Sequence, residues 1–259
     1  MNKKTLVAIA AVAVLGAVVL SAGCTRVPLT DSQKVFGGEQ GTSSTETTSA
    51  PLGGADRIDA TIRMGVGDLA VSSVPSQTAG FTGKFKYSPE SWKPEVTYGV
   101  GELADGVKVG VLYVGQPEAG GATKWLDAEN LWDLALASGV PTNVSLKMGV
   151  GQGNVDLSGV DVRHLEAVTG VGETKIDLSG PRLADVSGTI TTGVGDTTVR
   201  LPRDVGVQIT GGDGLGDVSS EGFNSSGNVK TNDAWGKPGP KITLKIVRGV
   251  GDVTFELVD

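Results

Sequence analysis

A polar residue follows a Gly-x-Gly triplet at seven places in the chain, and six of these residues are acidic. Repeated carboxylates of this kind can cap backbone N–H groups in turns, bind Ca²⁺ through their oxygens, or form an acidic catalytic row. The seven positions are Asp68, Glu102, Gln152, Glu173, Asp196, Asp217 and Asp252. Turn capping needs no further partner, and we therefore predict it.

A calcium ladder on Glu173, Asp196 and Asp217 is the alternative use of these carboxylates. The calcium-binding β-roll repeat is nine residues long, whereas these triplets recur at intervals of 21 to 23 residues. Gln152, in the same row, carries no charge. We therefore predict no metal site and no other cofactor.

Catalytic residues are scarce, because the chain has one cysteine, Cys24, and one histidine, His164. A Cys/His zinc site is excluded, and a Ser-His-Asp relay would have to use His164, which lies in the strand-like run DVRHLEAV. No triplet continues into a dinucleotide-binding or P-loop fingerprint. We predict that the protein is not an enzyme; an acidic, polysaccharide-active row is the alternative.

Four tryptophans are the residues that could stack on sugar rings: Trp92, Trp125, Trp132 and Trp235. Trp132 lies on an alternating strand, which indicates a core position. Trp235 lies in a Gly/Pro-rich insertion, which favours an exposed ring; contact of that ring with a ligand is the alternative.

The triplets must be positioned by strands, and their spacing indicates how. Their first glycines are residues 65, 99, 149, 170, 193, 214 and 249, and a period in the twenties is typical of a solenoid. Each unit reads as strand, corner, strand, with a perimeter of about 70 Å at ~3.3 Å per residue. We predict an all-β fold, a β-solenoid of roughly 22-residue rungs with a smaller N-terminal β part. A string of hairpins forming a sandwich is the alternative.

The corner glycines are predicted to be structural, because glycine permits positive φ and close approach of stacked backbones. In the repeats they are Gly149, Gly151, Gly170, Gly172, Gly193, Gly195, Gly214 and Gly216. The aliphatic residue inside every triplet is expected to point inward and stack into an apolar column. These residues are Val66, Val100, Val150, Val171, Val194, Leu215 and Val250.

The N-terminus reads as a secretion signal, with a basic MNKK segment, an apolar run and the small residues SAG before Cys24. This order resembles a bacterial lipobox, although Ser21 stands where leucine is usual. The resemblance implies removal of residues 1–23 and attachment of acyl chains such as palmitate to Cys24. An uncleaved membrane helix and a freely secreted protein are the alternatives.

The rest of the chain divides by composition. Residues 24–54 are rich in Ser, Thr and Gly and are predicted to be a flexible tether. Residues 55–120 form an N-terminal β region, and residues 121–259 form the solenoid repeats. Within the latter we expect an irregular turn near Leu126–Asn130 and a strand from Leu131 to Leu136.

The stretches WDLALASGVPTNVSLKMGVGQGNVDLSG and LSGPRLADVSGTITTGVGDTTVRLPRDVGVQITGG resemble the toast-rack domain of bacterial envelope proteins. That domain is related to the C-terminal halves of LiaF-type cell-wall-stress regulators and to "putative adhesin" β-solenoids. The resemblance implies a β-solenoid outside the membrane, with no established activity or cofactor.

These patterns predict a non-enzymatic surface lipoprotein, anchored in the cell membrane and facing away from the cytoplasm. It would serve as an interaction or envelope-stress-response accessory module, with an envelope protein or glycan as partner. The alternative is an adhesive, glycan-binding or self-assembling structural solenoid. A net charge of −7 without a basic cluster argues against nucleic acid as a partner.

Overall fold

The computed structural model describes residues 25–26, 43–117 and 128–259. The predicted signal peptide 1–23, Cys24 and Trp125 lie outside these described residues. The elements are β1 (Thr25–Arg26), β2 (Ser44–Ala50), β3 (Arg57–Val66), β4 (Asp68–Pro75), β5 (Phe81–Ser88), a 3-10 turn η1 (Glu90–Trp92), β6 (Glu95–Glu102), β7 (Lys108–Gly115), β8 (Glu129–Ser138), β9 (Thr142–Val150), β10 (Gly153–Asp156), β11 (Val162–Val171), β12 (Thr174–Asp177), β13 (Val186–Val194), β14 (Thr197–Pro202), β15 (Gly206–Gly211), β16 (Val218–Ser219), β17 (Phe223–Ser226), β18 (Val229–Asn232), β19 (Lys241–Val250) and β20 (Val253–Val258).

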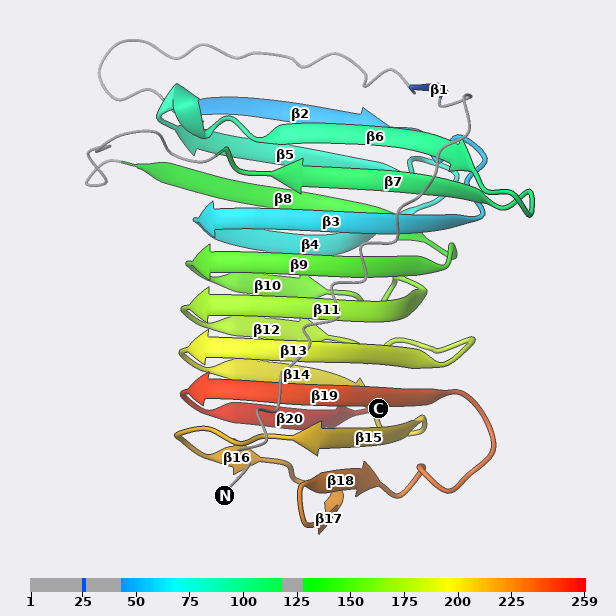
Figure 1. The fold of residues 1–259 in the computed structure, drawn as a ribbon, viewed down its shortest axis with the longest axis vertical. Helices are drawn as coiled ribbons and strands as arrows, with labels where there is room; N and C mark the ends of the chain where they lie inside the picture. The colour runs from blue at the N-terminus through cyan, green and yellow to red at the C-terminus, as the bar shows by residue number, and fades with distance from the viewer. Residues whose placement is uncertain (1–24, 27–42, 118–127) are drawn as a thin grey trace, which may run out of the picture.

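Two large sheets face each other and form an elongated stack (Figure 1). The first sheet has eleven strands in the order β1-β6-β7-β3-β9-β11-β13-β19-β15-β18-β17. The second has nine, in the order β16-β20-β14-β12-β10-β4-β8-β5-β2. The prediction of an all-β solenoid is confirmed.

A rung is one strand of each sheet joined by a Gly-x-Gly corner, as in β9–β10, β11–β12 and β13–β14. Neighbouring rungs pair in parallel in both sheets, and equivalent corner residues lie opposite one another, for example Val150 with Val171 and Val171 with Val194. The hydrogen bonds continue through the corner, because Gly151 N donates to Val171 O at 2.9 Å. Each rung is therefore a template for the next.

The stacking order departs from chain order at the C-terminal end. The last rung, β19–β20, lies between β13–β14 and β15–β16 (Figure 1). The long interval between the triplets at 214 and 249 is therefore not a simple insertion within one rung, because the chain passes the end of the stack and returns inside it. The ten-residue β19 thereby pairs along both of its edges, whereas the six-residue β15 is followed by the antiparallel strand β18.

At the other end, the solenoid begins earlier than predicted. The β3–β4 rung pairs in parallel with β9–β10, so the region 55–120 contributes a full rung. Strands β7 and β8 extend the two sheets in parallel, and β6 and β5 continue them antiparallel.

Two local predictions at this end are wrong. The tether cannot reach residue 54, because Ser44–Ala50 forms β2 and pairs antiparallel with β5; its β-branched threonines suit a strand. The turn predicted near Leu126–Asn130 does not extend to Asn130, because β8 begins at Glu129.

The triplet at Gly99 is not a corner. Gly99, Val100 and Gly101 lie within β6 and pair residue by residue with Val111, Gly110 and Val109 of β7. Gly101, the second glycine of this triplet, has no positive φ, unlike the second glycine of the corners. This triplet has the same Gly-Val-Gly sequence as the corners, but pairing with the antiparallel strand β7 keeps its backbone extended.

The core fills the space between the sheets with columns of aliphatic side chains in register. One column comes from the first sheet: Ile62, Leu146, Ala167, Ile190 and Ile246, all 3% exposed or less. A second comes from the facing sheet: Val71, Val155, Ile176, Val199 and Phe255.

The corner aliphatics stack in register, but they do not form part of this core. Val150, Val171 and Val194 are 48%, 49% and 50% exposed, and Leu215 is 70% exposed. The inward prediction is therefore wrong. The middle residue of a tight convex corner points away from the enclosed space, which the two columns already fill.

Candidate binding surface

The two glycines of each corner are required for different reasons. The second one has a positive φ, 132° at Gly172. The first allows close stacking: a Cβ on Gly170 would lie 2.2 Å from the carbonyl oxygen of Gly149 in the neighbouring rung. A side chain at either position would therefore separate the rungs.

The polar residues after the corners form a row across the rungs in the order Asp68, Gln152, Glu173, Asp196, Asp252 and Asp217. Three of these carboxylates accept hydrogen bonds from the backbone of the next rung: Asp68 from Gln152 N at 3.1 Å, Asp196 from Asp252 N at 3.0 Å and Asp252 from Asp217 N at 2.8 Å. We predicted that each would cap its own turn. The caps in fact join neighbouring rungs.

This order of the rungs does not fit the calcium alternative. Asp252 lies between Asp196 and Asp217, so the three predicted ligands are not successive. Within residues 43–117 and 128–259, no group of three His, Cys, Asp or Glu side chains is arranged to hold a metal ion.

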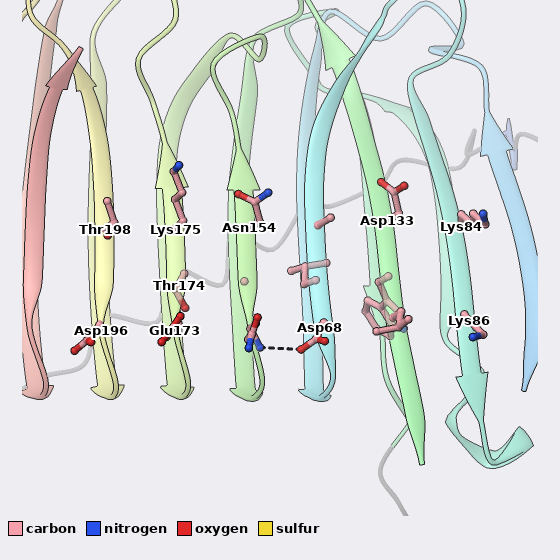
Figure 2. Close-up of a pocket in the computed structure, with 16 residues that line it drawn as sticks. Asp68, Lys84, Lys86, Asp133, Asn154, Glu173, Thr174, Lys175, Asp196 and Thr198 are labelled. Atoms are coloured by element: carbon pink, nitrogen blue, oxygen red, sulfur yellow. Dashed lines mark hydrogen bonds between the residues drawn. The ribbon is translucent and has the colours of Figure 1, made fainter. Parts of the chain in front are cut away.

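An open trough of about 940 Å³ runs across the outer face of the second sheet, beside this row. It crosses β5, β8, β4, β10, β12 and β14. Figure 2 shows two parallel rows of side chains along it: Lys86, Asp68, Glu173 and Asp196 in one, and Lys84, Asp133, Asn154, Lys175 and Thr198 in the other. Alternation along each strand places residues two apart on this face.

Charge is unevenly distributed along the trough. Lys84 and Lys86 lie at the β5 end, where Lys86 Nζ is paired with Glu129 at 2.6 Å. Glu173 and Asp196 lie at the other end, and the row continues past the trough to Asp252 and Asp217. The first row therefore becomes more acidic toward β14, whereas the second row includes Lys175 on β12.

Trp132 lies under the trough and is 2% exposed, as the core prediction required. Its Nε1 donates to Asn130 Oδ1 at 2.7 Å, and Asn130 Nδ2 donates to Val66 O at 2.6 Å. Gln116 Oε1 accepts from Gly65 N and Val66 N, at 2.8 and 2.9 Å. Gln116 and Asn130 thus satisfy the backbone of the first corner, where a preceding rung would lie.

The other aromatic and titratable candidates lie apart from the trough. Trp92 is buried, and Trp235 is half-buried with Lys241 Nζ 5.8 Å from its ring centre. His164 is exposed on the opposite sheet, 3.1 Å from Ser187 Oγ. The structure therefore does not bring Trp235, the tryptophan considered for ligand contact, together with the acidic row.

Asp177, on β12, is a buried carboxylate that sequence reasoning did not single out. Burial acts to raise its pKa, but hydrogen bonds from Ser179 and the nearby Arg200 guanidinium, 2.7 Å away, outweigh burial and lower the pKa. The charged form is therefore stabilised by Ser179 and Arg200 in the folded chain, which is a structural role.

Sequence reasoning also missed the second row of the trough, which includes Lys84, Asp133, Asn154 and Lys175. These residues come from four strands, and only pairing brings them together. Alternation of exposed and buried positions was the one signal available for them.

The comparisons with known proteins agree with this architecture. A family model described as the N-terminal domain of toast_rack, DUF2154, matches residues 39–200, and the chain belongs to this family. A solved structure of a "putative cell adhesion protein" from Clostridium sporogenes ATCC 15579 is 30% identical, with a TM-score of 0.74, over 84% of this chain and 100% of that chain.

More distant matches add nothing to the argument about function. A "putative adhesin" from Bacteroides fragilis NCTC 9343 is 13% identical, with a TM-score of 0.32, over 83% of this chain and 97% of that chain. No curated protein matches the chain. The part of the chain that the structure describes has no helix with the length and apolarity to cross a bilayer.

Proposed function

We propose that this protein is a non-enzymatic surface module, held on the outer side of the cell membrane by acyl chains on Cys24, that binds an envelope partner. The observation that carries the proposal is the trough, an open surface bordered by charged and polar side chains from six strands of a continuously hydrogen-bonded stack. A rigid surface of this size suits recognition of an extended partner.

The acidic side chains described in the trough have a structural use, which supports binding over catalysis. Asp68 and Asp196 each use one carboxylate oxygen to cap the next rung.

The anchor supports the envelope location. The signal-like N-terminus and the lipobox-like SAGC segment precede a Ser/Thr/Gly-rich spacer that would separate the stack from the bilayer. Regulation of an envelope stress response would follow from partner binding, and the resemblance to the C-terminal halves of LiaF-type stress regulators supports this part of the proposal.

An adhesive role is the second candidate. It is favoured by the Clostridium sporogenes protein described as a "putative cell adhesion protein", which is similar over its whole length. In that case the partner would be a glycan or protein on another surface.

A photo-crosslinking amino acid at position 154, in the trough, tests the proposal in intact cells. We expect adducts with an envelope protein or glycan, and none from the same amino acid at position 243 on the opposite sheet. Adducts of equal yield from both positions, or from neither, would contradict it. Cys24→Ala in parallel should abolish acyl labelling and release the protein from the membrane fraction.

A further inference from the structure

A strip of exposed aliphatic side chains runs along the corner edge of the stack. We call Val150, Val171, Val194, Val250 and Leu215 the corner strip. Register places them in that order on successive rungs, because Val194 pairs with Val250 and Val250 bridges to Leu215. Each is between 47% and 70% exposed.

Folding does not require aliphatic residues at these positions. The interior columns lie elsewhere, and the corner is made by its glycines. Threonine is also β-branched and would suit the strand end equally well. The chain nevertheless places a valine or leucine at every corner. Contiguous exposed apolar surface of this kind is typical of an interaction site.

A row of carboxylates lies beside the corner strip. Glu173, Asp196, Asp252 and Asp217 each follow a strip residue by two positions, and all four are exposed. At ~4.8 Å between rungs, four like charges over three intervals give a negative potential, with the Arg248 guanidinium as a nearby cation at the Asp217 end. The surface therefore offers apolar contact and negative charge side by side.

This combination decides among the candidate occupants. A second copy of the chain would bring two carboxylate rows together, at a cost in repulsion, and an anionic lipid surface would be repelled in the same way. A neutral glycan would match neither the valines nor the charge. A polypeptide segment with both aliphatic and cationic side chains complements both.

We propose that the corner strip and its carboxylate row form a docking surface for a cationic, aliphatic-bearing polypeptide segment. The strip spans about 19 Å, which corresponds to about six residues of extended chain. The inference rests on the proposed function and specifies the chemistry of its partner.

The test uses the full-length protein in detergent and a fluorescent eight-residue peptide of alternating Lys and Val. A Lys–Ser peptide keeps the charge without the aliphatic groups, and a Glu–Val peptide reverses the charge. We expect the Lys–Val peptide to bind at least about tenfold more tightly than either control, and to weaken with added salt.

Two variants locate the binding. The first, Val150→Thr with Val171→Thr and Val194→Thr, removes the aliphatic groups but keeps β-branching. The second, Glu173→Gln with Asp217→Asn, removes two charges and keeps Asp68, Asp196 and Asp252, the carboxylates that cap neighbouring rungs. Each should weaken Lys–Val binding by at least about fivefold. Should the threonine variant fail to fold, the charge variant and the salt dependence still decide.

The matched controls alter exposed residues away from the strip: Val111→Thr with Leu183→Thr, and Glu102→Gln with Glu166→Gln. They should leave binding unchanged. Equal binding of the Lys–Val and Lys–Ser peptides, or unchanged binding by both strip variants, would overturn the inference, as would capture of anionic vesicles or oligosaccharides instead of the peptide. If peptide binding is absent while crosslinks from position 154 persist in cells, this inference fails and the proposed function stands.

Discussion

Asp196 accepts a hydrogen bond at 3.0 Å from the backbone N–H of Asp252, a residue 56 positions further along the chain. The bond shows that the last rung lies directly against the β13–β14 rung. The same contact recurs at Asp68 with Gln152 and at Asp252 with Asp217. Carboxylates that the sequence predicted to cap turns thus act as links between rungs.

The corner glycines provide the clearest stability prediction. Gly172→Ala forces a side chain into a positive φ and places its Cβ 1.9 Å from Gly151 O. We expect a loss of about 2–4 kcal/mol in the free energy of unfolding, measured by urea denaturation.

Gly99→Ala is its control. Gly99 belongs to the same Gly-Val-Gly-Glu sequence, but it lies in a straight strand, and a Cβ added there would have no neighbouring atom within 4 Å. This substitution should change stability by less than about 0.5 kcal/mol. Equal losses in the two variants would show that the corners are not held by backbone contact.

The outward position of the corner aliphatics predicts a contrast between two identical substitutions. Val171→Thr lies at a half-exposed corner and should cost less than about 0.5 kcal/mol. Val155→Thr buries a hydroxyl in the core column, where Val155 is 1% exposed, and should cost about 1–3 kcal/mol. Thermal and urea unfolding measure both effects. A larger loss of stability in Val171→Thr than in Val155→Thr would contradict the outward position of Val171.

Asp177 predicts a pH dependence. Its pKa is lowered in the folded state, so its stabilisation is present above its unfolded pKa of 3.8 and is lost as the pH falls through the folded value. Asp177→Asn should therefore destabilise the protein by about 1–3 kcal/mol at pH 7 and by much less in strong acid.

Asp156→Asn is the matched control for that experiment. Asp156 is opposite Asp177 in the neighbouring rung and caps Ser158 in the same way, but it is exposed. Its effect at pH 7 should be the smaller of the two. An identical acid profile for wild type and Asp177→Asn would refute the assignment.

Arg248 predicts local unfolding at the end of the stack. Its guanidinium donates to the carbonyl oxygens of Gly212, Gly214, Asp217 and Gly251, at 2.9 to 3.3 Å, and so joins the last two rungs. Arg248→Met should increase amide exchange across residues 206–219 by about tenfold or more, because several charge-assisted bonds are lost.

Arg203→Met provides the comparison, since Arg203 is exposed and holds Leu257 O and Asp259 near the same end. We expect little change in exchange at β15 and β16. Uniform exchange across the whole stack in the Arg248 variant would mean that the end rung does not open separately.

Repeat spacing determined the fold class correctly, because a corner that recurs about every 22 residues returns the chain to the same place in each rung. The local amino-acid sequence predicted the structure of individual segments less well. At Gly99 an antiparallel neighbour keeps the same letters extended, and at Ser44–Ala50 a Ser/Thr-rich segment becomes a strand once β5 is available to pair. Pairing partners distant in sequence decide such cases.

By itself the sequence determined the all-β stack, the glycine corners, the acidic residues that follow them and the family. Only the tertiary structure decided that the corner aliphatics face solvent, that the final rung is inserted between earlier ones, and that side chains from six strands border one trough. The reason is physical: local pattern fixes the shape of one rung, whereas the order and facing of rungs follow from which backbone edges and apolar faces find their complement in three dimensions.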